Sequence, residues 1–156
     1  MNFTPRKADD DATTTVKLPQ YELVEKYMAT DLITFNLDNN MAEVIEKMVR
    51  YKISGASVVD ENNRLVGVIS EIDCMRLMID SAYHNLPLRD KHVKDYMTKV
   101  IKTVTPYMNI LDVAGEFVKT NLRRFPVISN GKLVGQISRH DVLKAANKMK
   151  KTTWGK

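Results

Sequence analysis

A chain of 156 residues, 44% hydrophobic and 28% charged, has room for one ordinary domain or two small ones, and its composition excludes a disordered or fibrous chain. No apolar run approaches the ~20 residues that a membrane-spanning helix needs, so we expect no membrane span. The net charge is 24 − 19 = +5, and because the last fifteen residues hold five lysines and no acid, the rest of the chain is neutral.

Residues 1–20 lack the apolar stretch of a secretory signal, and we interpret them as a disordered polar arm. Cys74 is the only cysteine, which excludes an intramolecular disulfide and agrees with a reducing compartment. We therefore expect a cytoplasmic protein.

The first structured unit is expected to span residues 21–80. It opens with a β-rich run at 32–35, and Asn40 can then cap a helix whose apolar residues recur at helical spacing. Residues 57–69 contain two β-rich runs around a turn rich in Asn and Asp, a pattern that predicts a hairpin. A closing helix begins near Ile72, so the order of elements is β-α-β-β-α.

The same order recurs in the second half of the chain. Val93 aligns with Val24 at an offset of 93 − 24 = 69, and GQISRHD, from Gly135, repeats GVISEID, from Gly67. The remaining boundaries are a linker at 81–92, a second unit at 93–148 and a basic tail at 149–156. Because each unit is too small to bury a core alone, we predict an α+β fold in which two tandem β-α-β-β-α units pack sheet to sheet with pseudo-twofold symmetry.

Each unit carries V-x-x-Y-M, a strand with Thr, a P-V-I or S-V-V strand, and G-x-[IV]-S-x-x-D. These motifs resemble the CBS domain, whose tandem pairs are called Bateman modules, over about four fifths of the chain. The resemblance implies a stand-alone regulatory module without catalytic activity, whose paired copies form clefts for adenosine-containing ligands. AMP, ADP or ATP is the expected ligand, S-adenosylmethionine is a further candidate, and no catalytic cofactor is expected.

The resemblance also implies which residues form the clefts. Asp73 and Asp141 would accept hydrogen bonds from ribose hydroxyls, and Ser70 and Ser138 would donate to ribose or phosphate oxygens. The residues expected around the adenine are Thr34, Ser57 and Val58 in the first copy and Thr103, Pro126 and Val127 in the second. The remaining candidates are Ile72, Arg123, Arg124, Phe125, Arg139 and His140.

From the residues alone, the doubled S-x-x-D has two interpretations. A Ser at a helix N-cap with an Asp three residues on satisfies backbone donors without any ligand, and this role is compatible with binding. Guanidinium groups bind phosphate through two hydrogen bonds, whereas the first copy has Glu71 inside its motif. We therefore hypothesise that the second site prefers a phosphorylated ligand and that the first is weaker or empty.

An enzyme is not expected. Ser138, His140 and Asp141 are too close along the chain to form a hydrolase triad, and no glycine-rich phosphate loop is present. His84 and His92 lack the spacing of metal ligands, so no metal site is expected either.

The expected partners are a second copy of the chain, bound through helical faces rich in Met, Leu and Val, and an unidentified protein target. One alternative is that the basic end binds nucleic acid or an anionic surface, through Lys144, Lys148, Lys150, Lys151, Lys156 and Trp154. Basic ends are more often solubilising, so nucleic acid is not the expected partner. A ligand-free interaction module is a third hypothesis, which the intact Ser and Asp in both copies disfavour.

Overall fold

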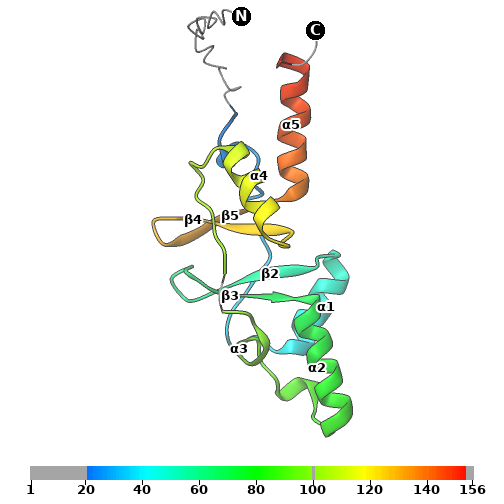
Figure 1. Cartoon of the computed structure of the whole chain (residues 1–156). Coiled ribbons are helices and arrows are strands. Elements are labelled where there is room, and N and C mark those ends of the chain that lie inside the picture. Colours follow the sequence, from blue (N-terminus) through cyan, green and yellow to red (C-terminus); the bar gives the residue numbers. More distant parts are fainter. Residues whose placement is uncertain (1–20, 100, 154–156) are drawn as a thin grey trace, which may run out of the picture.

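The structure is a computed structural model that describes residues 21–99 and 101–153. The expected polar arm at 1–20 lies outside the described residues, as do Trp154 and Lys156 of the basic tail. Two small β-sheets stack in the middle of the molecule, and helices cover the outer side of each sheet (Figure 1).

The first half of the chain forms a three-stranded sheet and two long helices. Its elements are β1 (Thr34–Phe35), α1 (Met41–Tyr51), β2 (Gly55–Val59), β3 (Leu65–Ser70) and α2 (Glu71–His84). β1 runs parallel to β2, and β2 is antiparallel to β3. As predicted, Asn40 caps α1, because its side chain accepts a hydrogen bond from the amide of Ala42. The predicted stripe is Met41, Val44, Ile45 and Met48, of which Ile45 is partly buried and the other three are buried.

The second half repeats this arrangement. Its elements are α4 (Ile110–Lys119), β4 (Arg124–Ser129), β5 (Lys132–Ser138) and α5 (Arg139–Thr153). β4 and β5 are antiparallel, and where the first unit has β1 the second has a single parallel bridge between Val104 and Val127. Shorter helices are η1 (Val24–Lys26), η2 (Leu88–Asp90) and α3 (Val93–Tyr96). The predicted α+β class with two tandem units is therefore confirmed.

The opening segment of each unit packs on the other unit. Val24 is completely buried in a core with Val104 and Phe125 of the second half, whereas Val93 is completely buried in a core with Phe35 of the first half. The exchange follows from backbone hydrogen bonds at the sheet edges, since η1 leads into a segment that pairs with β5 and α3 into one that pairs with β3. Each core is thus completed by the opposite half of the chain.

Two glycines make this exchange possible. A Cβ at Gly67 would lie 2.6 Å from Met97 Sδ and 3.1 Å from the carbonyl oxygen of Thr98. At Gly135 it would lie 2.7 Å from the carbonyl oxygen of Ala29. The opening segments therefore run directly over these glycines. This contact gives a physical reason for the recurrence of both the Y-M pair and the glycine of G-x-x-S.

Candidate functional site

A cavity of about 410 Å³ lies where the two sheets face each other. Its walls come from β2, β3 and the start of α2, from β4 and β5, and from the chain around Ile101 and Leu122. The lining residues are Ser54, Gly55, Ala56, Ser57, Val68, Ile69, Ser70, Ile72, Thr98, Ile101, Lys102, Asn121, Leu122, Arg123, Arg124, Pro126 and Gln136. None of these described residues is acidic, so the cavity combines apolar walls with positive charge.

Some of the predicted site residues line this cavity. They are Ser57, Ser70, Ile72, Arg123, Arg124 and Pro126. Sequence reasoning assigned the arginines to a site of the second copy, but the structure places them in one cavity with Ser70 and Ile72 of the first copy. The grouping by copy is thus replaced by a cavity shared between copies, because the two sheets stack face to face.

The other predicted residues lie outside the lining. Val58, Phe125 and Val127 are completely buried in the two cores. Thr34 pairs with Ser57 across the sheet, and Thr103 is exposed. The start of α5 holds the rest of the second motif, namely Ser138, Arg139, His140 and Asp141.

Sequence reasoning missed eleven of the seventeen lining residues, which are Ser54, Gly55, Ala56, Val68, Ile69, Thr98, Ile101, Lys102, Asn121, Leu122 and Gln136. Two of them directly precede predicted residues, Lys102 before Thr103 and Leu122 before Arg123. Ile101 and Lys102, like Leu122 and Arg123, are consecutive residues that line the cavity together, so the alternation expected of an extended segment gave no signal for them.

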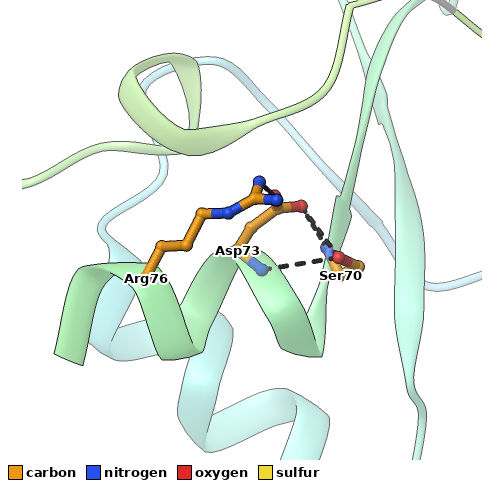
Figure 2. Close-up of polar contacts among 3 residues, drawn as sticks. All are labelled: Ser70, Asp73 and Arg76. Atoms are coloured by element: carbon orange, nitrogen blue, oxygen red, sulfur yellow. Dashed lines mark hydrogen bonds and ion pairs between the residues drawn. The ribbon is translucent and has the colours of Figure 1, made fainter. Parts of the chain in front are cut away.

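Both S-x-x-D motifs form capping boxes at the starts of α2 and α5. Asp73 Oδ2 accepts hydrogen bonds from the Ser70 amide at 2.8 Å and from Ser70 Oγ at 2.9 Å, as Figure 2 shows. Ser138 and Asp141 repeat both contacts at 2.9 Å. The structure therefore assigns the recurring motif a definite role in starting each closing helix.

The two aspartates differ in how much of the carboxylate remains available. Asp73 is 2% exposed, and its Oδ1 is bound to Arg76 Nη1 at 3.2 Å (Figure 2). The Asp141 side chain is 18% exposed, and Lys144 Nζ lies 3.9 Å from its Oδ1. Asp141 thus keeps one oxygen weakly engaged, whereas both oxygens of Asp73 have close partners.

Arg124 crosses from β4 to the first unit at the wall of the cavity. Its Nη1 donates to the carbonyl oxygen of Gly55 at 3.2 Å, and its Nη2 donates to Ser54 Oγ. Burial lowers the pKa of Arg124, and repulsion from Arg123 lowers that pKa further, yet a guanidinium stays protonated at neutral pH. The charge of Glu71 acts in the opposite direction and raises the pKa of Arg124, but no described acidic side chain forms an ion pair with this guanidinium, so a half-buried positive charge faces the cavity.

Lys102 provides a third cationic group at the cavity. Its Nζ lies 2.9 Å from Glu116 Oε2 on α4. This hydrogen bond holds the pKa of the Glu116 carboxyl below its usual range. Because the Lys102 side chain is half exposed, it can reorient toward a ligand at small cost.

Among the described residues, no group of three or more His, Cys, Asp and Glu is placed to hold a metal ion. No helix in the described part of the chain is long and apolar enough to cross a membrane.

A family model of the CBS domain matches residues 24–87 and 93–148. Protein MJ1225 of Methanocaldococcus jannaschii is 32% identical over 123 residues, which cover 79% of this chain and 42% of that protein. The structure of CBSX2 in complex with AMP has 30% sequence identity and a TM-score of 0.72, covering 82% of this chain and 98% of that one. CBSX2 comes from Arabidopsis thaliana.

The CBS domain pair of protein MJ0100, solved with 5-methylthioadenosine and S-adenosyl-L-methionine, has a TM-score of 0.68 at 22% identity, and 83% of this chain and 98% of that one are covered. At this identity the likeness concerns the fold alone. The two matched segments coincide with the two structural repeats, and the chain therefore belongs to the CBS domain family as a tandem pair.

Proposed function

We propose that this CBS pair is a cytoplasmic, non-catalytic regulatory module that binds an adenosine nucleotide in the cavity between its sheets. The observation that carries the proposal is the cationic wall formed by Lys102, Arg123 and Arg124 beside apolar walls. A cavity of about 410 Å³ lies within the range of small-molecule sites. The likeness to a CBS pair that binds AMP supports the same ligand class here.

The lining divides into two chemical parts. The apolar lining residues are Ala56, Val68, Ile69, Ile72, Ile101, Leu122 and Pro126. They suit the faces of an adenine ring, which gains from apolar contact and needs few polar partners. The cationic residues suit phosphate, since hydrogen bonds between charged groups are the strong ones.

The charge of the cavity favours AMP, ADP or ATP over S-adenosylmethionine. The sulfonium of S-adenosylmethionine is a cation, and Arg124 already lacks an acidic partner among the described residues. Placing a second cation beside it adds repulsion in a partly buried site. Phosphate removes that repulsion, so the more highly phosphorylated ligands should bind more tightly.

Calorimetry with AMP, ADP, ATP, adenosine, S-adenosylmethionine and GMP tests the proposal. We expect the adenine nucleotides to bind, and a ligand at 100 times its dissociation constant to add about 2.7 kcal/mol of stability. Arg123→Ala should weaken AMP binding about tenfold, while Lys132→Ala, a matched change on an exposed residue outside the cavity, should not. Wild-type protein that binds none of the adenosine compounds would contradict the proposal.

Two of the lysines in the nucleic-acid alternative have weak ionic contacts within the protein. Lys144 lies 3.9 Å from Asp141, and Lys148 lies 4.0 Å from Glu22 and over the ring of Tyr27. Such lysines are partly neutralised by the protein itself. We also propose that the module forms a homodimer and acts on a separate protein target.

A further inference from the structure

Arg124 of the second copy contacts Gly55 and Ser54 of the first copy, which occupy the positions equivalent to Arg124 and Arg123. The repeat offset relates Arg124 to Gly55, as 124 − 55 = 69, and Arg123 to Ser54, as 123 − 54 = 69. Arg124 Nη1 donates to Gly55 and Nη2 to Ser54. These contacts therefore cross the boundary between the units beside the cavity, and a single side chain makes them.

Only one copy can supply a long side chain at this boundary. An arginine at both positions would bring two like charges together, and the first copy has Gly55 instead. A Cβ there would lie 3.1 Å from the carbonyl oxygen of Ile69, which is tighter than an ordinary contact. The local backbone thus favours glycine at position 55, and the Arg124 guanidinium lies against Gly55 and Ser54.

We infer that Ser54 sets the affinity of the cavity for phosphate. Its hydroxyl accepts a hydrogen bond from Arg124 Nη2, and a bound phosphate must replace that hydroxyl to accept from the same group. The inference rests on the proposed function, since it concerns the same cavity. A phosphate is a stronger acceptor than a neutral hydroxyl, so it competes with Ser54 for Nη2. Ligand binding then loosens the contact between β4 and the first unit.

Ser54→Ala tests this competition directly. Removing the hydroxyl frees Nη2, so AMP should bind about three- to tenfold more tightly, the range that one ordinary hydrogen bond contributes. Adenosine, which has no phosphate to compete, should bind with unchanged affinity. Isothermal titration calorimetry measures both, and Ser129→Ala, at the end of β4 and outside the cavity, is the matched control.

The gain in AMP affinity caused by Ser54→Ala must depend on Arg124. In an Arg124→Ala background, Ser54→Ala should leave AMP affinity unchanged, and a persisting gain would overturn the inference. Weaker AMP binding by the single Ser54→Ala variant would also overturn it, because the hydroxyl would then contact the ligand. Unchanged binding would show that no competition exists. Circular dichroism checks that each variant is folded.

Failure of the proposed function gives a different result. If no adenosine compound binds the wild-type protein, that proposal fails, and pyrophosphate becomes the probe for Arg124. The inference then expects that pyrophosphate raises the melting temperature of Ser54→Ala more than that of the wild type. An equal rise in both would reject it.

Discussion

At the scale of single residues, both oxygens of the Asp73 carboxylate are already engaged by groups of the protein. Its carboxylate accepts from the Ser70 amide and hydroxyl and pairs with Arg76. Removing it leaves the Ser70 amide at the start of α2 without its acceptor. The Asp141 carboxylate makes the same cap contacts but is less buried and has only the more distant Lys144.

Asp73→Ala should therefore lower the free energy of unfolding by about 2 kcal/mol, and Asp141→Ala by about 1 kcal/mol. Urea unfolding of the ligand-free protein measures both, with Asp31→Ala as the exposed control. Equal losses at the two positions would mean that the extra contact with Arg76 contributes nothing.

Tyr27 makes stability depend on pH in the alkaline range. Burial, and then the hydrogen bond from its hydroxyl to Glu22, raise the pKa of Tyr27 to about 12 from the ordinary 10.0. The raised pKa means that the folded state keeps its proton where the unfolded state loses it. The contribution is complete below pH 10 and is lost as pH rises through about 12.

The free energy of unfolding should thus fall more steeply between pH 10 and about 12 in the wild type than in Tyr27→Phe. Denaturant unfolding at a series of pH values measures the slopes. Tyr83→Phe is the control, because the Tyr83 side chain is 83% exposed and should not alter the slope. Parallel curves for wild type and Tyr27→Phe would show that Tyr27 does not cause the pH dependence of the free energy of unfolding.

At the scale of elements, the sequence predicted the four longer helices and the two hairpins, but not η1, η2 or α3, nor which half each opening segment packs on. Asn40 before an apolar stripe carries the signal for α1, and the doubled S-x-x-D carries the capping boxes. The exchange of η1 and α3 depends on backbone pairing between distant segments. A repeat shows where a segment recurs, and backbone pairing leaves no mark on side-chain spacing.

Only some of the residues that line the cavity could be predicted from the sequence. Residues of the G-x-x-S-x-x-D motif and of the strand at Arg124–Pro126 could be named from the resemblance. The contact of Arg124 with Ser54 and Gly55 could not, because it depends on how two sheets stack across a boundary. Residues such as Lys102 were missed for the same reason.

Substitutions at Gly67 and Gly135 test whether the opening segment of each unit packs on the other unit. A Cβ at position 135 meets the backbone of Ala29, which cannot move without breaking the pairing with Gln136. Gly135→Ala should cost about 3 kcal/mol of unfolding free energy, as overpacking of a tight contact does. Gly67→Ala should cost less, because its nearest contact is the flexible end of Met97.

Gly115 supplies the matched control for both variants. Nothing lies within 4 Å of a Cβ placed there, and the residue is inside α4. Gly115→Ala should raise stability by about 0.5–1 kcal/mol, the helix preference of Ala over Gly. A Gly135→Ala protein as stable as Gly115→Ala would contradict the packing of the opening segment.

At the scale of the whole molecule, α1 and α2 present an apolar face to solvent. Its exposed residues are Val49, Ile72, Met75, Met78 and Ile79, each at least half exposed. A groove between the two helices, lined by Met48 and Cys74 among others, continues this face inward. Contiguous apolar surface of this kind marks an interface.

The proposed homodimer would place a second copy of the chain on this face. The surrounding residues carry both signs, with Glu46 and Glu71 beside Arg50 and Lys52, so the face can pair with itself around a twofold axis. Ile72 belongs both to this face and to the lining of the cavity. A dimer formed here would therefore sense ligand occupancy through the start of α2.

If copies pair through this face as proposed, Met75→Glu should convert the dimer to a monomer, because it places a charge on the apolar face, where burial without a partner is costly. Multi-angle light scattering over a range of concentrations measures the change. Val118→Glu, on the 87% exposed Val118 of α4, introduces the same charge on the opposite helical layer and should leave the dimer intact. If Val118→Glu dissociates the protein while Met75→Glu does not, copies meet through α4, and occupancy of the cavity cannot reach the interface through Ile72.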